Sequence, residues 1–170
     1  EFSVFLFLIL STYKKTYSFS LVIQRCSMKK KILITTGTRA EYGILRPLLE
    51  GIQQSKKLDL LLVVTGTHLS KKYGYTIQEI IKDGFKISKK IPMMPKSDEN
   101  YSMSVSLGLG IVDFSNCFKS LKPDVNIILG DRDEMLASSL AASHMNIINA
   151  HIHGGDVSGG LDEYNRHAIT

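Results

Sequence analysis

Four short segments place glycine, charged or histidine residues directly after apolar runs that are typical of β-strands. In chain order they are Gly37-Thr38-Arg39-Ala40-Glu41, Gly66-Thr67-His68, Gly130-Asp131-Arg132 and His153-Gly154-Gly155-Asp156. In an open parallel sheet the ligand crevice lies beyond the carboxyl ends of the strands, so we expect these residues to gather at one edge. Their side chains suit proton transfer and the binding of an anion.

The first of these segments could bind a phosphate group. Gly37-Thr38-Arg39 opens a predicted helix, whose free backbone N–H groups favour an anion, and an arginine adds a charge-assisted contact. No Gly-Lys-Ser/Thr follows at the P-loop spacing, and the dinucleotide pattern G-x-G-x-x-G is absent at this turn. For a lone Gly-x-Arg, a solvated cation in the first helical turn is the commoner explanation of Arg39.

Acid–base candidates follow the later strands. Asp131 ends the apolar run N-I-I-L, where a catalytic carboxylate and an N-cap of the following helix are equally good explanations. Asp162 is also ambiguous, because the dipole of a helix stabilises acids in its first turn. Arg166 lies four residues later and could simply pair with Asp162. His153 precedes two glycines that let a substrate approach, and its imidazole could act as a general acid or base.

A metal site is the weaker explanation of the histidines. On a strand, His151 and His153 would point to the same face, with Asp156 nearby. A bare His-x-His is common, however, and a hydrogen-bonded histidine explains it more simply. Cys26 and Cys117 lie in no metal-ligand spacing and form no disulfide framework, which favours a reducing compartment. We therefore expect no metal, and we assign His144 and Cys117 to structural roles.

The elements that must position these residues alternate between strands and helices, as in an α/β parallel sheet covered by helices. Strands are predicted at 31–36, 58–65, 85–91, 124–131 and 146–153. Helices are predicted at 40–54, 76–84, 101–121 and 132–144, and a last one begins at about Asp162. Two prolines mark 92–100 as a loop.

Composition and charge exclude several classes of protein. A length of 170 residues with 44% apolar and 22% charged residues indicates one globular domain rather than a disordered or multi-span membrane protein. The net charge of +5 arises from the first 31 residues, and from Ile32 onward fifteen basic residues face fifteen acidic ones. We therefore expect no nucleic-acid partner and no membrane partner.

The two ends of the sequence differ from the body. The apolar run at 2–10 is too short for a membrane helix. It follows Glu1 and precedes Lys14 and Lys15, whereas a secretory signal has its positive charges before the apolar run, so the order is wrong for such a signal. We expect residues 1–27 to be an upstream or non-native leader that is dispensable for folding, and 28–170 to be the domain. The last predicted helix reaches Thr170 without a C-cap glycine, so we expect the sequence to be truncated there.

Four segments carry a resemblance to a known family: G-T-R-A-E-Y-G (37–43), T-G-T-H-L-S (65–70), L-G-D-R (129–132) and H-I-H-G-G-D-V-S-G-G-L-D-E-Y-N-R-H-A-I-T (151–170). Taken together, they resemble the hydrolysing UDP-N-acetylglucosamine 2-epimerases. The resemblance covers residues 28–170. It implies the N-terminal Rossmann-like domain of a two-domain, glycosyltransferase-B-like fold, with the active site between the domains and the second domain absent here. The segment R-H-A-I-T is similar to the hydrolysing branch of the family.

The resemblance also implies a reaction and its residues. A base removes the proton on carbon 2, UDP leaves carbon 1, and water adds to the glycal to give N-acetylmannosamine, with no cofactor. Asp131 and Asp162 match catalytic carboxylates of the family, and Arg166 matches a catalytic-site arginine. Arg39, Gly43 and Arg132 match positions that contact UDP. His68 is expected to line the same cleft. His153 stands where many members carry glutamate, so an acid–base role is implied with an undefined partner in proton transfer.

Several alternatives stay open at the level of the sequence. Members with His-Ile-His-Gly-Gly exist and some act on 2,4-diacetamido sugars, so the substituent at carbon 4 is undetermined. A non-catalytic nucleotide-sugar-binding domain is the alternative from another class, and sequence beyond Thr170 would discriminate it from an enzyme. For the enzyme we expect a UDP-sugar substrate in sialic-acid-type sugar biosynthesis, a cytoplasmic location and a homo-oligomer.

Overall fold

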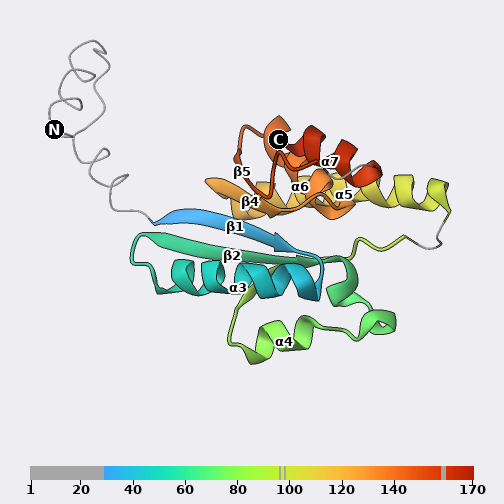
Figure 1. The fold of residues 1–170 in the computed structure, drawn as a ribbon. Coiled ribbons are helices and arrows are strands. Elements are labelled where there is room, and N and C mark those ends of the chain that lie inside the picture. The colour runs from blue at the N-terminus through green and yellow to red at the C-terminus, as the bar shows by residue number, and fades with distance from the viewer. Residues whose placement is uncertain (1–28, 96, 98, 158–159) are drawn as a thin grey trace, which may run out of the picture.

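Five β-branched, apolar runs of the sequence form one parallel sheet in the computed structural model, which describes residues 29–95, 97, 99–157 and 160–170 (Figure 1). The predicted leader, 1–27, lies outside the described residues. The strands are β1 (Lys30–Thr36), β2 (Leu58–Thr65), β3 (Ile87–Ile91), β4 (Val125–Leu129) and β5 (Ile148–Ile152). They lie in the order β3-β2-β1-β4-β5 and every neighbouring pair is parallel. This is the Rossmann-like order, so the predicted fold class is confirmed.

Helices cover both faces of the sheet. One face packs against α3 (Arg39–Gln54) and α4 (Ile77–Lys82), and the other against α5 (Asn100–Leu121) and α6 (Asp133–His144), with α7 (Leu161–Ile169) beside α6 (Figure 1). Two short 3-10 turns, η1 (Gly66–Leu69) and η2 (Lys71–Tyr73), follow β2. The sequence pattern predicts a loop for this stretch.

The alternation of side chains along β1 separates two cores. Ile32 and Ile34 pack with the buried residues of α3, whereas Leu33 packs with α5 and α6. Cys117 belongs to the second core, where burial raises the pKa of its thiol to about 11. A thiol that stays protonated at neutral pH is a poor nucleophile, which agrees with the structural role assigned to it.

Predicted strand ends differ from the observed ones where the backbone turns left-handed. The run predicted as 124–131 ends at Leu129 because Gly130, with φ of 78°, turns the chain. The run predicted as 146–153 is shortened at both ends, because Asn146 and His153 have φ of 56° and 61°. β3 begins at Ile87 rather than 85, since the Phe85 N–H donates to Ile80 O at the end of α4.

α5 approaches its neighbours closely at Gly110. A Cβ added there would lie 2.5 Å from Met93 Sδ and 3.3 Å from Ala137 Cβ. Gly108, two residues earlier on the same helix, is exposed and would meet nothing within 4 Å. The two glycines therefore differ in packing but not in secondary structure.

We expect Gly108→Ala to raise the free energy of unfolding by up to about 1 kcal/mol, because alanine favours a helix over glycine. Gly110→Ala gains the same propensity but overpacks the contact with Met93, so it should be less stable than Gly108→Ala by about 1–3 kcal/mol. Urea unfolding of both variants measures the difference. Equal stabilities would show that α5 has room at position 110.

A buried histidine ties η1 to β1 and to the start of α4. His68 has no exposed surface, and its Nε2 lies 3.1 Å from the Thr36 hydroxyl and its Nδ1 2.7 Å from the Thr76 hydroxyl. Burial lowers the pKa of His68 to about 4, against smaller opposing effects of the Thr38 backbone and Glu79. The imidazole is therefore neutral at physiological pH.

This lowered pKa makes stability depend on pH. Between pH 6.5 and 4 the unfolded chain protonates His68 while the folded chain does not, so acidification favours unfolding, by up to roughly 3 kcal/mol from this residue. Urea unfolding at pH 7 and pH 4.5 should show a smaller acid-induced loss for His68→Gln than for wild type. The exposed His144 provides the control, since His144→Gln should keep the wild-type loss. An unchanged loss in His68→Gln would contradict the assignment.

Candidate active site

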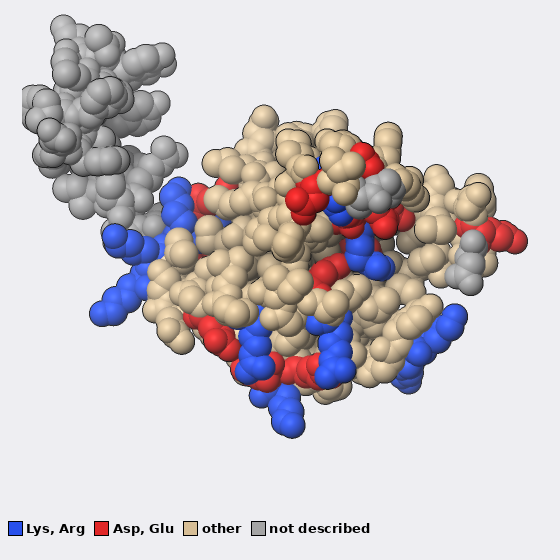
Figure 2. Space-filling model, viewed as in Figure 1, with Lys and Arg blue, Asp and Glu red and all other residues tan. Residues whose placement is uncertain are grey.

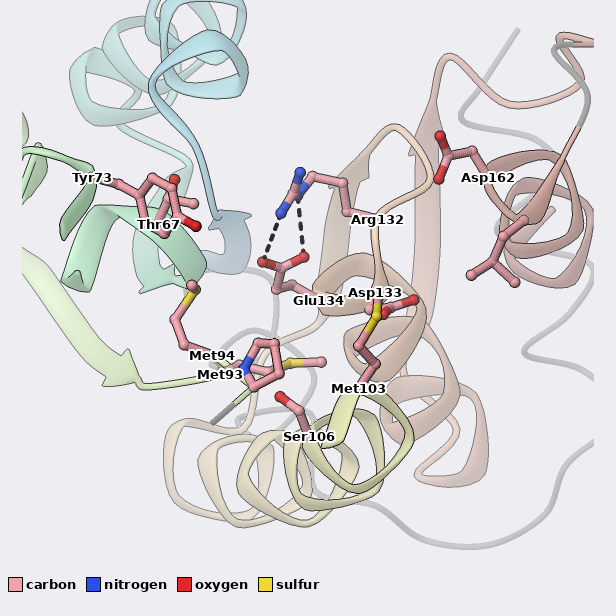
Figure 3. A pocket seen from close by; sticks show the side chains of 12 residues that line it. Thr67, Tyr73, Met93, Met94, Met103, Ser106, Arg132, Asp133, Glu134 and Asp162 are labelled. Carbon is pink, nitrogen blue, oxygen red and sulfur yellow. Dashed lines mark hydrogen bonds and ion pairs between the residues drawn. The ribbon is translucent and has the colours of Figure 1, made fainter. Parts of the chain in front are cut away.

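The ends of β1, β2 and β4 meet around a cluster of one arginine and two buried glutamates, which we call the Arg132 cluster (Arg132, Glu41 and Glu134). Arg132 Nε donates to Glu134 Oε2 at 3.2 Å and Nη2 donates to Oε1 at 3.3 Å (Figure 3). Glu41 Oε1 lies 3.7 Å from the same Nε. The glutamate side chains are 6% and 11% exposed, whereas Arg132 is 46% exposed. The two glutamates thus fix the guanidinium on its buried side, and its exposed side is open to a ligand.

Glu41 is held by the start of α3. Its carboxylate accepts hydrogen bonds from the N–H groups of Gly37, at 2.7 Å, and Thr38, at 3.2 Å, while the Thr38 hydroxyl accepts from the Glu41 N–H. This capping box fills the helix N-terminus with a protein carboxylate. Burial raises the pKa of Glu41 above its ordinary value, and the negative charge of Glu134 adds to the rise.

Glu134 determines the backbone around it. A Cβ on Gly66 would lie 2.4 Å from Glu134 Oε1 and 2.9 Å from the Gly37 carbonyl oxygen, and Gly66 also has φ of 56°. No other residue type fits there without displacing the carboxylate. Three segments that are distant in sequence therefore meet at one buried charge.

A cavity of about 410 Å³ opens beside the Arg132 cluster (Figure 3). One side consists mostly of polar groups from strand ends and helix starts, namely Thr67, Arg132, Asp133, Glu134 and Asp162, together with Tyr73 and the apolar Leu161. The opposite side consists of residues that follow β3 and of the first turns of α5, including Met93, Met94, Pro95, Met103 and Ser106. Of the predicted site residues, Arg132 and Asp162 line this cavity, whereas Asp131, His153 and Arg166 follow neighbouring strands without being part of its lining.

Asp131 forms an ion pair with Arg166 of α7. Arg166 Nη2 contacts Asp131 Oδ2, and the side chains are only 12% and 18% exposed. The N-cap of α6 is Arg132, so Asp131 does not cap that helix. Arg166 contacts Asp131 in place of the pairing with Asp162 that its spacing allows. The pair fixes the orientation of the Asp131 carboxylate.

The loop after β5 continues this pair towards His153. The second terminal nitrogen of Arg166 donates to the Asp156 carbonyl oxygen at 2.9 Å, and His153 Nδ1 lies 3.6 Å from the Asp156 carboxylate. The His153 side chain is 59% exposed. Asp131, Arg166, Asp156 and His153 therefore form one connected series at the edge of the sheet, with His153 accessible to a ligand.

His151 is occupied by local hydrogen bonds. Its Nε2 donates to the Gly130 carbonyl oxygen at 2.7 Å and its Nδ1 lies 2.8 Å from the Thr170 hydroxyl. Because His153 has left the strand conformation, the two rings do not share a strand face. Within the described part of the chain, no three His, Cys, Asp or Glu side chains are grouped so that they could hold a metal ion.

The remaining predicted residues lie away from the cavity. Arg39 begins α3, is 73% exposed and pairs with Glu79 of α4 at 3.1 Å. Gly43 is exposed on the same helix, one turn further on. His68 is buried between Thr36 and Thr76, so it supports the wall from behind and does not line the cleft as predicted.

The surface charges agree with the neutral body of the sequence. On the face shown in Figure 2, basic side chains lie beside acidic ones along the lower edge. None of the helices in the described ranges combines the length and apolarity needed to cross a bilayer.

Sequence reasoning missed the two glutamates of the Arg132 cluster and the methionines of the cavity. The pattern Thr38-x-x-Glu41 is a capping-box signature and could have identified Glu41. Glu134 carries no such signal, because an acid in a first helical turn is usually solvated. The methionines follow a strand and begin a helix, positions at which the sequence does not distinguish a cavity wall from a core.

The chain is similar to known proteins of one family. The family model described as UDP-N-acetylglucosamine 2-epimerase matches residues 50–170. The chain is 46% identical to the UDP-N,N'-diacetylbacillosamine 2-epimerase (hydrolyzing) of Legionella pneumophila over 143 residues, 84% of this chain and 38% of that protein. It is 43% identical to the GDP/UDP-N,N'-diacetylbacillosamine 2-epimerase (hydrolyzing) of Campylobacter jejuni, over 84% of this chain and 37% of that protein.

A solved structure has the same fold. The UDP-GlcNAc 2-epimerase of Neisseria meningitidis, bound to UDP-GlcNAc, superposes with a TM-score of 0.68 at 22% identity, covering 82% of this chain and 37% of that one. The chain thus spans under two fifths of the length of these proteins. With the family model matched over most of its length, the chain belongs to the UDP-N-acetylglucosamine 2-epimerase family.

Proposed function

We propose that the protein is a hydrolysing 2-epimerase of a UDP-linked 2-acetamido sugar. The observation that carries this proposal is the series Asp131, Arg166, Asp156 and His153 at the same sheet edge as the cavity that Arg132 and Asp162 line. Acid–base groups and an exposed guanidinium are what an elimination from a nucleotide sugar requires. The names of the 46% and 43% identical relatives support the hydrolysing reaction.

The reaction divides into an elimination and an addition. A base takes the proton from carbon 2, the C–H electron pair forms the double bond between carbons 1 and 2, and UDP leaves with the electrons of its bond to carbon 1. Water then adds its oxygen to carbon 1, and carbon 2 receives a proton on the opposite face. The products are UDP and the free sugar with inverted configuration at carbon 2.

We propose roles in these steps for the predicted site residues. Asp131, His153 and Asp162 are the candidate proton carriers, and Arg166 orients Asp131. Arg132 neutralises charge on the departing diphosphate, because it is the cavity arginine with an open side. Arg39 and Gly43 lie on α3 outside the cavity, so any UDP contact that they make belongs to a more distant part of the nucleotide.

Two sugars are candidates for the substrate. The resemblance of the sequence motifs favours UDP-N-acetylglucosamine, with N-acetylmannosamine as product for sialic-acid-type biosynthesis. The two relatives most similar among those described above carry names that specify UDP-N,N'-diacetylbacillosamine, a 2,4-diacetamido-2,4,6-trideoxy sugar, and this now favours the diacetamido substrate. The solved structure bound to UDP-GlcNAc supports the other candidate at lower identity.

The second domain, the cellular location, the oligomeric state and the partners of the protein remain predictions. The resemblance implies an active site between two domains, and one domain alone cannot exclude water from such a cleft, so we expect activity to require the second domain. A cytoplasmic location, a homo-oligomer and the absence of a nucleic-acid partner likewise remain predicted. The non-catalytic alternative, a domain that binds a nucleotide sugar without turnover, is tested by the same assays as the enzyme.

The first assay runs the protein in its full natural length with each UDP-sugar in deuterium oxide. We expect free UDP and a 2-epimerised sugar that carries deuterium at carbon 2, because the returned proton has exchanged with solvent. Mass spectrometry and proton NMR of the product measure the label. A product with only protium at carbon 2 would exclude the elimination mechanism, and binding without release of UDP would support the non-catalytic alternative.

The second assay replaces Asp131. Asp131→Asn keeps the shape of the side chain and its contact with Arg166 but cannot ionise, so turnover should fall by roughly two to four orders of magnitude. Asp124→Asn is the matched control, since Asp124 precedes the same strand at the opposite edge of the sheet and pairs with Lys30 at 2.8 Å. Thermal unfolding of both variants separates folding from chemistry. Near-normal turnover by Asp131→Asn would refute its acid–base role.

A further inference from the structure

The candidate cavity has two unlike walls, and its apolar wall has no part in the chemistry described so far. We call Met93, Met94, Pro95 and Met103 the methionine wall. Met93 is buried, Met94 and Pro95 are partly exposed, and Met103 is 37% exposed. In Figure 3 these methionines lie across the cavity from Arg132 and above the start of α5. Methionine is unbranched and polarizable, so this wall can adapt to an apolar group.

The first turns of α5, which carry Met103 of this wall, have little charge. Lys96, Asp98 and Glu99 precede the helix in sequence, but residues 100–112 contain no charged residue, and Ser106 is the polar side chain that they contribute to the cavity lining. By contrast, the opposite wall contributes Arg132, Asp133, Glu134 and Asp162. A ligand that is polar on one side and apolar on the other would therefore match the two walls.

The shape of a pyranose ring orients such a ligand. In the proposed reaction carbons 1 and 2 must face the acid–base groups and the diphosphate must approach Arg132. Carbons 4 and 5 lie on the opposite side of a six-membered ring, so their substituents face the methionine wall. In N-acetylglucosamine these substituents are a hydroxyl and a hydroxymethyl group, whereas in a 2,4-diacetamido-2,4,6-trideoxy sugar they are an acetamido and a methyl group.

We infer that Met94 and Met103 determine specificity, by contacting the carbon-4 acetamido methyl and the carbon-6 methyl of a UDP-linked 2,4-diacetamido-2,4,6-trideoxy sugar. This inference rests on the proposed function and specifies its substrate. A hydroxyl against thioether side chains loses hydrogen bonds to water and gains none, whereas a methyl group gains apolar contact. An apolar wall of this kind discriminates by roughly ten- to a hundredfold, because it disfavours a hydroxyl without excluding it.

The test measures kcat/KM for both UDP-sugars with the protein in its full natural length. Glutamine has nearly the shape of methionine but carries an amide that can hydrogen-bond a hydroxyl group. Met103→Gln and Met94→Gln should each lower the preference for the diacetamido sugar by roughly tenfold. Met145→Gln is the matched control, because Met145 is also 37% exposed but follows α6, outside the cavity lining. It should keep the wild-type preference.

The outcomes separate this inference from the proposed function. A wild-type preference for the diacetamido sugar that falls in both cavity variants and not in Met145→Gln supports the inference. Turnover of both sugars with a ratio unchanged by Met94→Gln and Met103→Gln overturns it and leaves the 2-epimerase function intact, as does a wild-type preference for UDP-N-acetylglucosamine. Turnover of neither sugar by the wild type overturns the proposed function and the inference together.

Discussion

The candidate site depends on the burial of the Glu134 carboxylate against the Arg132 guanidinium. A buried carboxylate without a counter-ion costs several kcal/mol of folding free energy, so the Arg132 guanidinium must stay paired with Glu134. The same carboxylate requires glycine at position 66 and lies against the Gly37 turn. One charge thus aligns the ends of β1, β2 and β4 and orients the exposed side of Arg132 towards the cavity.

Glu41 brings a second negative charge to a single arginine, and its surroundings show how the excess charge is tolerated. Two backbone N–H groups at the start of α3 stabilise its anion, while burial and Glu134 oppose ionisation and raise its pKa. The Glu41 carboxylate therefore occupies the Gly37 and Thr38 N–H groups that precede α3. Under the proposed function, this leaves the diphosphate to be bound by side chains such as Arg132.

The sequence predicted the sheet well because hydrophobic periodicity records which face of each strand is buried, and β2 was predicted to the residue. It predicted strand ends less well, since left-handed residues such as Asn146 and His153 are not glycines and give no local signal. Among site residues, Asp131 and Arg166 lie together as a shared site requires. His68 does not reach the cleft, because a strand-end position alone cannot distinguish a side chain that points to solvent from one that packs under the next turn.

The two walls of the cavity come from elements with different constraints. The ionic wall is built on strand ends and helix starts whose buried charges and required glycine leave little freedom for substitution. The methionine wall is built on the segment after β3 and on a nearly uncharged helix end, where a side chain can change without exposing a buried charge. If the proposed function and the specificity inferred for the methionine wall hold, the wall that carries Arg132 and Asp162 can stay fixed while the methionine wall changes, so related domains could share the reaction and differ in the sugar.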